Sequence, residues 1–199
     1  MSRSARRVNR GPAAAAENRR ALVEAARKLL AQRGYDVPRS AIAKEAGVSQ
    51  AVMYRHFPNR VDLALEAFKD NYSQVDQIVS ECGENAIFVL WDWLLERAIV
   101  DIGFIEAMRA ARTEVAHYEG AKRLEEALEQ ALEQAREADH ELGELSASDL
   151  MKAWRMAYGL VITSGPQEVA LSDLRRDLSI SAVEALFAQG KSGRAADGA

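Results

Sequence analysis

An all-α fold is predicted by three features of this 199-residue sequence. Apolar residues recur at the three- and four-residue intervals of an amphipathic helix, and no segment alternates with the two-residue period of a strand. Glycine and proline residues separate the periodic segments. The composition, with 48% apolar and 28% charged residues, is that of an ordinary globular protein. About nine helices are expected.

The first third of the chain is predicted to contain a tail and three short helices. Residues 1–16 are basic and rich in small residues, so we expect them to be disordered. A helix with an apolar stripe follows over residues 18–32. Two short helices are predicted next. Pro38 starts the first of them and Gly47 interrupts it, whereas Ser49 caps the second and Pro58 ends it.

Longer helices are predicted beyond residue 60. Leucines at intervals of four in one of them, Leu124, Leu128 and Leu132, indicate a buried face. Ser146 and Asp149 can form a capping box at the start of another. The expected ranges are 60–79, 85–100, 102–116, 119–138, 146–163 and 172–189. Residues 191–199 are expected to form a flexible tail.

The charge of the chain is distributed unevenly. The net charge is −4, but residues 1–60 contain 13 Lys and Arg against 4 Asp and Glu. The rest of the chain therefore holds 13 basic and 26 acidic residues. Such asymmetry indicates a module that faces phosphates, joined to a body with another role. A solvated basic face is the alternative.

The single cysteine fits a reducing compartment, and the hydropathy of the chain indicates neither a signal peptide nor a membrane helix. Cys82 is the single cysteine, so the chain can form no internal disulfide. The arginines near the N-terminus are not followed by the apolar run of a signal peptide. No apolar stretch approaches the roughly 20 residues that a membrane helix needs. We expect a cytoplasmic protein with no membrane partner.

Residues 42–53 carry the pattern of a helix-turn-helix. Two helices that cross at a sharp angle need a small residue at their contact, and Ala43 provides one. The turn needs a residue that tolerates positive φ, and Gly47 follows four positions later. Ile42, Val48 and Met53 can fill the shared core. An ordinary helical corner is the alternative to a DNA-binding motif.

The block from Gly34 to Arg60, which includes the run Tyr54-Arg-His-Phe-Pro-Asn-Arg60, resembles the DNA-binding domain of the TetR family of repressors. The resemblance covers roughly residues 18–68. It implies a three-helix helix-turn-helix domain over residues 17–60. It also implies a C-terminal helical domain over residues 61–190 that binds an effector and forms a homodimer.

The resemblance also implies how the first domain binds double-stranded DNA. The helix over residues 49–57 enters the major groove, with Gln50 and Ala51 nearest the base edges and Gln50 able to pair with adenine. The side chains of Tyr54 and His56 contact phosphates. The residues given a DNA-binding role are Arg39, Ser40, Ser49, Gln50, Ala51, Tyr54, His56 and Arg60.

The chain departs from the family pattern just before the motif tyrosine. Ala51-Val52 replaces the usual Gly-Thr pair, so one hydroxyl that could bind a phosphate is lost. Val52 either touches a thymine methyl or faces the core. Phe57 is expected in the core, and a core position with a locally satisfied hydroxyl is the alternative for Tyr54. The operator sequence stays open.

The resemblance implies that the last two long helices form the dimer. Each has an apolar face with small residues that allow close approach, although burial within one subunit is the alternative. The interface candidates are Leu150, Ala153, Ala157, Leu160, Leu174, Leu178 and Ala182. A dimer implies a pseudo-palindromic operator, because it presents two recognition helices about one DNA turn apart.

The middle helices hold the candidates for an effector pocket, which are Phe88, Trp91, Phe104, Met108, Tyr118, Trp154 and Tyr158. They suggest a small apolar or aromatic effector that releases a repressor from its operator, unless these side chains only fill the core. DNA contacts do not distinguish repression from activation. No cofactor and no catalytic residue are expected.

Three other functions have less support in the sequence. The pairs Glu114-x-x-His117 and Glu137-x-x-His140 have the spacing of di-iron helical bundles, but two further inward glutamates would be needed. Hydrolase motifs such as Gly-x-Ser-x-Gly do not occur. A helical protein-interaction module without DNA binding is the remaining alternative, and only the Ala51-Val52 departure favours it.

Overall fold

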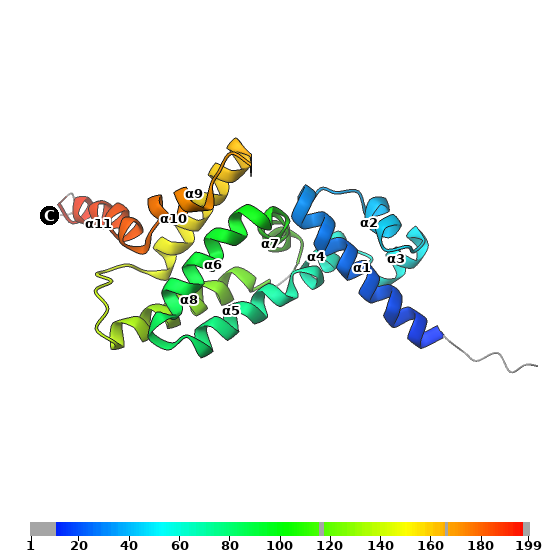
Figure 1. Cartoon of the computed structure of the whole chain (residues 1–199), viewed down its shortest axis with the longest axis horizontal. Helices are drawn as coiled ribbons and strands as arrows, with labels where there is room; N and C mark the ends of the chain where they lie inside the picture. Colours follow the sequence, from blue (N-terminus) through cyan, green and yellow to red (C-terminus); the bar gives the residue numbers. More distant parts are fainter. Residues whose placement is uncertain (1–10, 116–117, 166, 197–199) are drawn as a thin grey trace, which may run out of the picture.

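The computed structural model describes residues 11–115, 118–165 and 167–196, and within these ranges every regular element is helical (Figure 1). None of the described helices is long and apolar enough to span a membrane. The elements are α1 (Gly11–Arg33), α2 (Arg39–Glu45), α3 (Gln50–His56), α4 (Arg60–Ala67), α5 (Lys69–Glu81), the 3-10 turn η1 (Gly83–Asn85), α6 (Ala86–Val100), α7 (Ile102–Glu114), α8 (Gly120–Glu137), α9 (Ala147–Ser164), α10 (Leu171–Asp177) and α11 (Ile180–Ala196).

The first four helices gather at one end of the molecule (Figure 1). The helix α1 packs against α2, α3 and α4. Its predicted apolar stripe is buried, and the innermost side chains of this cluster include Leu22, Leu30, Ile42 and Met53. A small apolar core therefore holds α2 and α3 on the side of α1.

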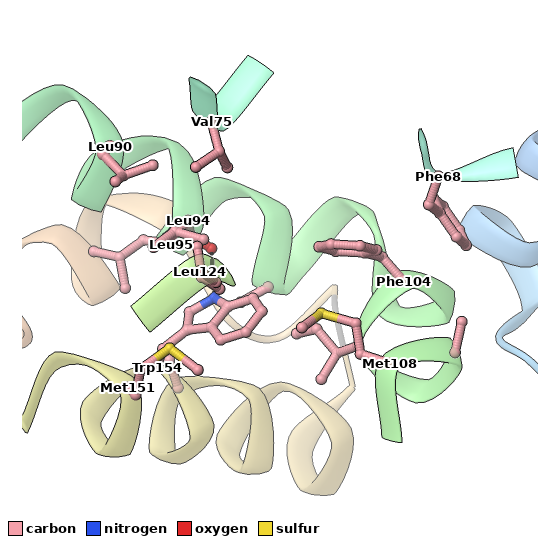
Figure 2. Packing of buried hydrophobic residues seen from close by; sticks show 14 of the residues in the cluster. Phe68, Val75, Leu90, Leu94, Leu95, Phe104, Met108, Leu124, Met151 and Trp154 are labelled. Atoms are coloured by element: carbon pink, nitrogen blue, oxygen red, sulfur yellow. Dashed lines mark hydrogen bonds between the residues drawn. The ribbon is translucent and has the colours of Figure 1, made fainter. Parts of the chain in front are cut away.

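The helix α6 runs through the centre of the body and packs against α5, α8 and α9. Leu90 and Leu94 on α6 are fully buried, as are Leu128 and Leu132 on α8. The leucine face predicted for α8 is thus confirmed. The indole N–H of Trp154 donates a hydrogen bond to the carbonyl of Leu94 at 2.8 Å, which ties α9 to α6 (Figure 2).

Two helices that were predicted as continuous are broken, so eleven α-helices replace the expected nine in the described residues. The segment 60–79 is interrupted at Phe68, whose buried ring packs against Phe104 with centroids 5.5 Å apart (Figure 2). The segment 172–189 is interrupted at Leu178 and Ser179. The carbonyl of Leu178 instead accepts the indole N–H of Trp91 at 2.6 Å.

The terminal predictions are corrected in part. Helix α1 begins at Gly11, so residues 11–16 are helical and not a disordered tail. The alanines at 13–16 have the highest helix propensity, and a proline is tolerated in a first turn. Helix α11 continues to Ala196, through most of the segment expected to be flexible. Residues 1–10 and 197–199 lie outside the described residues.

The capping box predicted before α9 is confirmed. The Ser146 hydroxyl accepts the backbone N–H of Asp149 at 3.3 Å, and the Asp149 carboxylate accepts the backbone N–H of Ser146 at 3.3 Å. Two donors that a helix start leaves without partners are satisfied in this way.

Candidate nucleic-acid interface

The turn between α2 and α3 is closed by backbone hydrogen bonds around Gly47. The N–H of Gly47 donates to the carbonyl of Lys44 at 3.1 Å, and the N–H of Val48 donates to that of Ala43 at 3.0 Å. Gly47 has φ +68°, the left-handed conformation that favours glycine. The buried methyl of Ala43 lies at the helix contact. The helix-turn-helix predicted from residues 42–53 is therefore present.

The helix α3 has one face inside the domain and one face outside it. Ser49 caps its start by accepting the backbone N–H of Val52 at 3.3 Å. Met53 and, after the helix end, Phe57 are buried. Gln50 and Ala51 are exposed on the outer side. Gln50 and Ala51, which the family resemblance places nearest the base edges, are therefore accessible on α3.

Tyr54 lies on the exposed face of α3, where half of its surface (50%) is accessible. This exposure excludes the alternative that Tyr54 is a core aromatic. The guanidinium of Arg39 stacks over its ring at 4.1 Å. The stacking restricts the ring of an exposed side chain, which suits a contact with a phosphate.

Arg39 joins the start of α2 to the end of α3. Its guanidinium donates to the carbonyl of Pro58 at 2.8 Å and also to the carbonyl of Phe57. Its buried Nε has no hydrogen-bond partner among the described atoms. Arg39 therefore positions Tyr54 and α3. The family resemblance implied a DNA-binding role for Arg39 and did not suggest this positioning role.

Arg60 has a similar internal contact at the start of α4. It donates to the backbone carbonyl of Tyr35 at 2.5 Å and lies 5.4 Å from the centre of the Tyr35 ring. His56, at the end of α3, is half-buried. Arg60 thus connects the loop after α1 with α4, the helix that leads out of the domain.

Two basic residues at this surface were not singled out from the sequence. Lys44, together with Ser40 and Gln50, lines a shallow groove of about 570 Å³ between α2 and α3. Arg55 is exposed on α3. Arg55 is four residues after Ala51 in α3 and so lies on the same face of the helix, which means that the helical period alone could have identified it. The position of Lys44 beside Gln50 could not be inferred from the sequence, because it depends on how α2 and α3 cross.

Comparison with known proteins agrees with this geometry. Residues 22–67 match the family described as bacterial regulatory proteins, tetR family. An HTH-type transcriptional regulator of Staphylococcus aureus (strain USA300) is 28% identical over 115 residues, which make up 54% of this chain and 62% of that protein. Residues 22–67 therefore resemble the N-terminal DNA-binding domain of the tetR family of bacterial regulatory proteins.

Solved structures of TetR-family proteins share the fold along most of the chain. A TetR transcription regulatory protein from Mycobacterium vanbaalenii is 24% identical, with a TM-score of 0.55 over 76% of this chain and 95% of that chain. A gamma-butyrolactone receptor described as ArpA-like is 18% identical, with a TM-score of 0.58 over 89% of this chain and 98% of that one. The curated relatives from Staphylococcus aureus are matched over less than two thirds of their own length.

The effector candidates fall into two groups. Trp91, Phe104, Met108 and Trp154 are buried in the continuous core, and Figure 2 shows Trp154 beside Leu94 and Leu124. Tyr118 instead borders a surface groove, and its hydroxyl lies 2.6 Å from that of Tyr72.

The two remaining effector candidates lie apart from that groove. Phe88 is exposed on α6, with its ring 5.2 Å from the ring of His140. Tyr158 is half-buried on α9 and contacts the Glu106 carboxylate. Its pKa is raised to about 12, first by burial and then by the charge of Glu106.

Most of the dimer candidates are inside the subunit. Leu150, Ala153, Ala157 and Leu174 are buried by the chain's own helices, so they are not available to a partner. Their helical period indicates an apolar face but does not say what covers it. Leu160 is exposed, whereas Leu178 and Ala182 are half-buried.

The two Glu-x-x-His pairs have different outcomes. His117 lies outside the described residues, so the first pair has no structural account. His140 packs against Phe88 at the end of α8. Across the described ranges, no three His, Cys, Asp or Glu side chains are grouped as a metal ion would require.

Proposed function

We propose that this chain is a cytoplasmic DNA-binding transcriptional regulator of the TetR family. It binds a pseudo-palindromic operator as a homodimer and acts as a repressor that a small apolar or aromatic effector releases. The single observation that carries the proposal is the outer face of α3, where Gln50, Ala51 and Tyr54 are exposed above a buried Met53.

The surroundings of α3 suit a contact with phosphates. Ser40 and Lys44 border the groove beside Gln50, and Arg55 extends from α3 itself. Basic and hydroxyl side chains around a helix in the major groove fix its register, while side chains at base edges provide specificity. Gln50 can form a bidentate pair with adenine.

The exposed apolar side chains of α9 support the homodimer. Met156 and Leu160 are one helical turn apart on the outer face, and about half of each is accessible. They border a groove of about 480 Å³ between α9 and α10, where Val169 contributes a further apolar surface. A second copy that covers this face would form the dimer through α9, as the resemblance implies, but through residues other than the buried Leu150 and Ala153.

The test is a mobility-shift titration of the full chain with the DNA upstream of its own gene, at several salt concentrations. We expect a shifted complex whose affinity falls steeply as salt rises, because phosphate contacts release counterions. The Gln50→Ala variant should lose about tenfold or more in affinity for that DNA and little for random DNA, because a base contact carries sequence information.

The matched control is Gln77→Ala, which truncates an exposed glutamine on α5. It should bind DNA as the parent chain does. A chain that binds no DNA at low salt would refute the proposal. A Gln50→Ala variant that binds the upstream DNA as tightly as the parent chain does would refute the role of Gln50 on α3.

A further inference from the structure

A surface groove of about 480 Å³ lies beside the junction of α4 and α5. Leu65 at the end of α4 and Lys69 and Tyr72 on α5 form one wall. Tyr118, just before α8, and Arg123 on α8 form the other. The volume is within the range of small-molecule sites. The two phenol rings and the leucine provide apolar surface inside it.

The hydroxyls of Tyr72 and Tyr118 leave one hydrogen-bond donor unused. They lie 2.6 Å apart, so one hydroxyl donates to the other. Burial raises the pKa of both phenols, which therefore keep their protons at neutral pH. Two phenols have two protons, and a single shared hydrogen bond uses one of them. The second proton is available to an acceptor in the groove.

Among the residues that the structure describes, the ion pairs around the groove do not include Lys69. Lys122 pairs with Glu126 at 3.3 Å, and Arg123 pairs with Asp76. Among the described residues, Lys69 and Glu119 have no ion-pair partner. The ammonium of Lys69 and the free phenol proton both favour a negatively charged acceptor, whereas exposed Glu119 disfavours one.

We propose that this groove binds a small organic carboxylate with an aromatic or aliphatic body, and that it is the effector site of the chain. The carboxylate accepts a hydrogen bond from the tyrosine pair and lies against Lys69. The apolar body lies on Leu65 and the phenol rings. The effector role rests on the proposed function as a DNA-binding regulator.

Aromatic packing connects the groove to the DNA-binding end. The ring of Tyr72 meets Phe104 edge-on at 5.8 Å, and Phe104 packs on Phe68 at 5.5 Å (Figure 2). Phe68 separates α4 from α5. A ligand that moves Tyr72 therefore acts on the point where the chain leaves the first domain, and it can bias the orientation of α4.

The binding test uses 1-naphthoate as probe, titrated calorimetrically into the full chain, with the uncharged 1-naphthamide as its matched ligand. We expect 1-naphthoate to bind and the amide to bind at least tenfold more weakly. Lys69→Gln and Tyr118→Phe should each weaken naphthoate binding about tenfold, because each removes a partner of a charged group. Glu119→Gln should strengthen it, and Lys152→Gln on α9, remote from the groove, should leave it unchanged.

Three results would overturn the proposal: no heat at millimolar 1-naphthoate, equal binding of the amide, or insensitivity to both Lys69→Gln and Tyr118→Phe. The same samples are assayed for DNA binding without probe. Loss of DNA binding refutes the proposed function, whereas intact DNA binding with a failed titration refutes the groove alone. Naphthoate that binds the groove without lowering DNA affinity refutes the effector role.

Discussion

The carboxylate of Glu106 on α7 accepts the backbone N–H of Tyr35 at 2.5 Å, across the boundary between the DNA-binding helices and the body. Together with burial, the charge of the same carboxylate helps to raise the pKa of Tyr158 on α9. The carbonyl of Tyr35 also accepts a hydrogen bond from Arg60 on α4. The loop between α1 and α2 is therefore bound both to α7, through Glu106, and to α4, through Arg60. This loop therefore fixes how the first domain sits on α7.

Replacement of Glu106 should loosen this boundary. Glu106→Ala leaves the Tyr35 N–H without its acceptor, and we expect a loss of about 1–3 kcal/mol in the free energy of unfolding. Glu106→Gln retains an acceptor oxygen and should lose less. Urea unfolding followed by circular dichroism measures both, with Glu133→Ala, exposed on α8, as control. Equal stability of the Ala and Gln variants would contradict the role of this hydrogen bond.

Arg39→Lys should reduce both stability and DNA affinity. A lysine has no planar guanidinium, so it cannot stack flat on Tyr54 while it donates to the carbonyls of Phe57 and Pro58 in a fixed geometry, and we expect a loss of about 1–2 kcal/mol in stability. DNA affinity should fall to a similar extent for every target sequence, because the change disturbs position and not base contacts. Thermal unfolding and mobility shifts provide the measurements. Arg55→Lys is the control for stability, and a drop as large in that variant would count against the specific role of Arg39.

Leu160→Asp should separate the subunits without unfolding them. Leu160 is exposed in the single chain, so an aspartate there costs little within the subunit but disfavours an apolar interface. Sedimentation velocity should show a monomer with a helical circular dichroism spectrum. Leu150→Asp, by contrast, places a charge in the core and should unfold the chain. A Leu160→Asp protein that stays dimeric would place the interface elsewhere.

Stability should fall in alkaline solution. Burial raises the pKa of Tyr158 to about 12 from an ordinary value of 10, and it also raises the pKa of Tyr72 and Tyr118. Above pH 10 the unfolded chain releases phenol protons that the folded chain retains, so the contribution present below pH 10 is lost as pH rises toward 12. The melting temperature should therefore drop between pH 10 and pH 12. Tyr158→Phe should reduce that drop, and an unchanged drop would refute the role of Tyr158.

Local signals in the sequence predicted the elements at the DNA-binding end. Gly47, Ser49 and Pro58 act on the backbone of their own or adjacent residues, so their effects could be inferred without the rest of the chain. The capping box before α9 is local in the same sense. The exposure of Tyr54 followed from the family resemblance and agrees with the structure.

Contacts between distant segments could not be inferred in this way. The hydroxyls of Tyr72 and Tyr118 meet across 46 positions of sequence, and no local period links them. The break at Phe68 depends on Phe104, which lies on another helix. Helix α9 has an apolar face toward the core and another at the surface, so periodicity alone assigned Leu150 and Leu160 to the same interface.

The interruption at Phe68 shortens the arm on which the DNA-binding end can swing. Helix α4 has 8 residues, and at about 1.5 Å per residue it is about 12 Å long, against about 30 Å for the uninterrupted segment of roughly 20 residues. A tilt of about 5° would move the far end of such an arm by only about 1 Å, where the longer rod would move it by about 2.6 Å. To displace α3 by the same distance, α4 must therefore rotate through a larger angle than the uninterrupted helix would. That rotation would be concentrated at the buried Phe68.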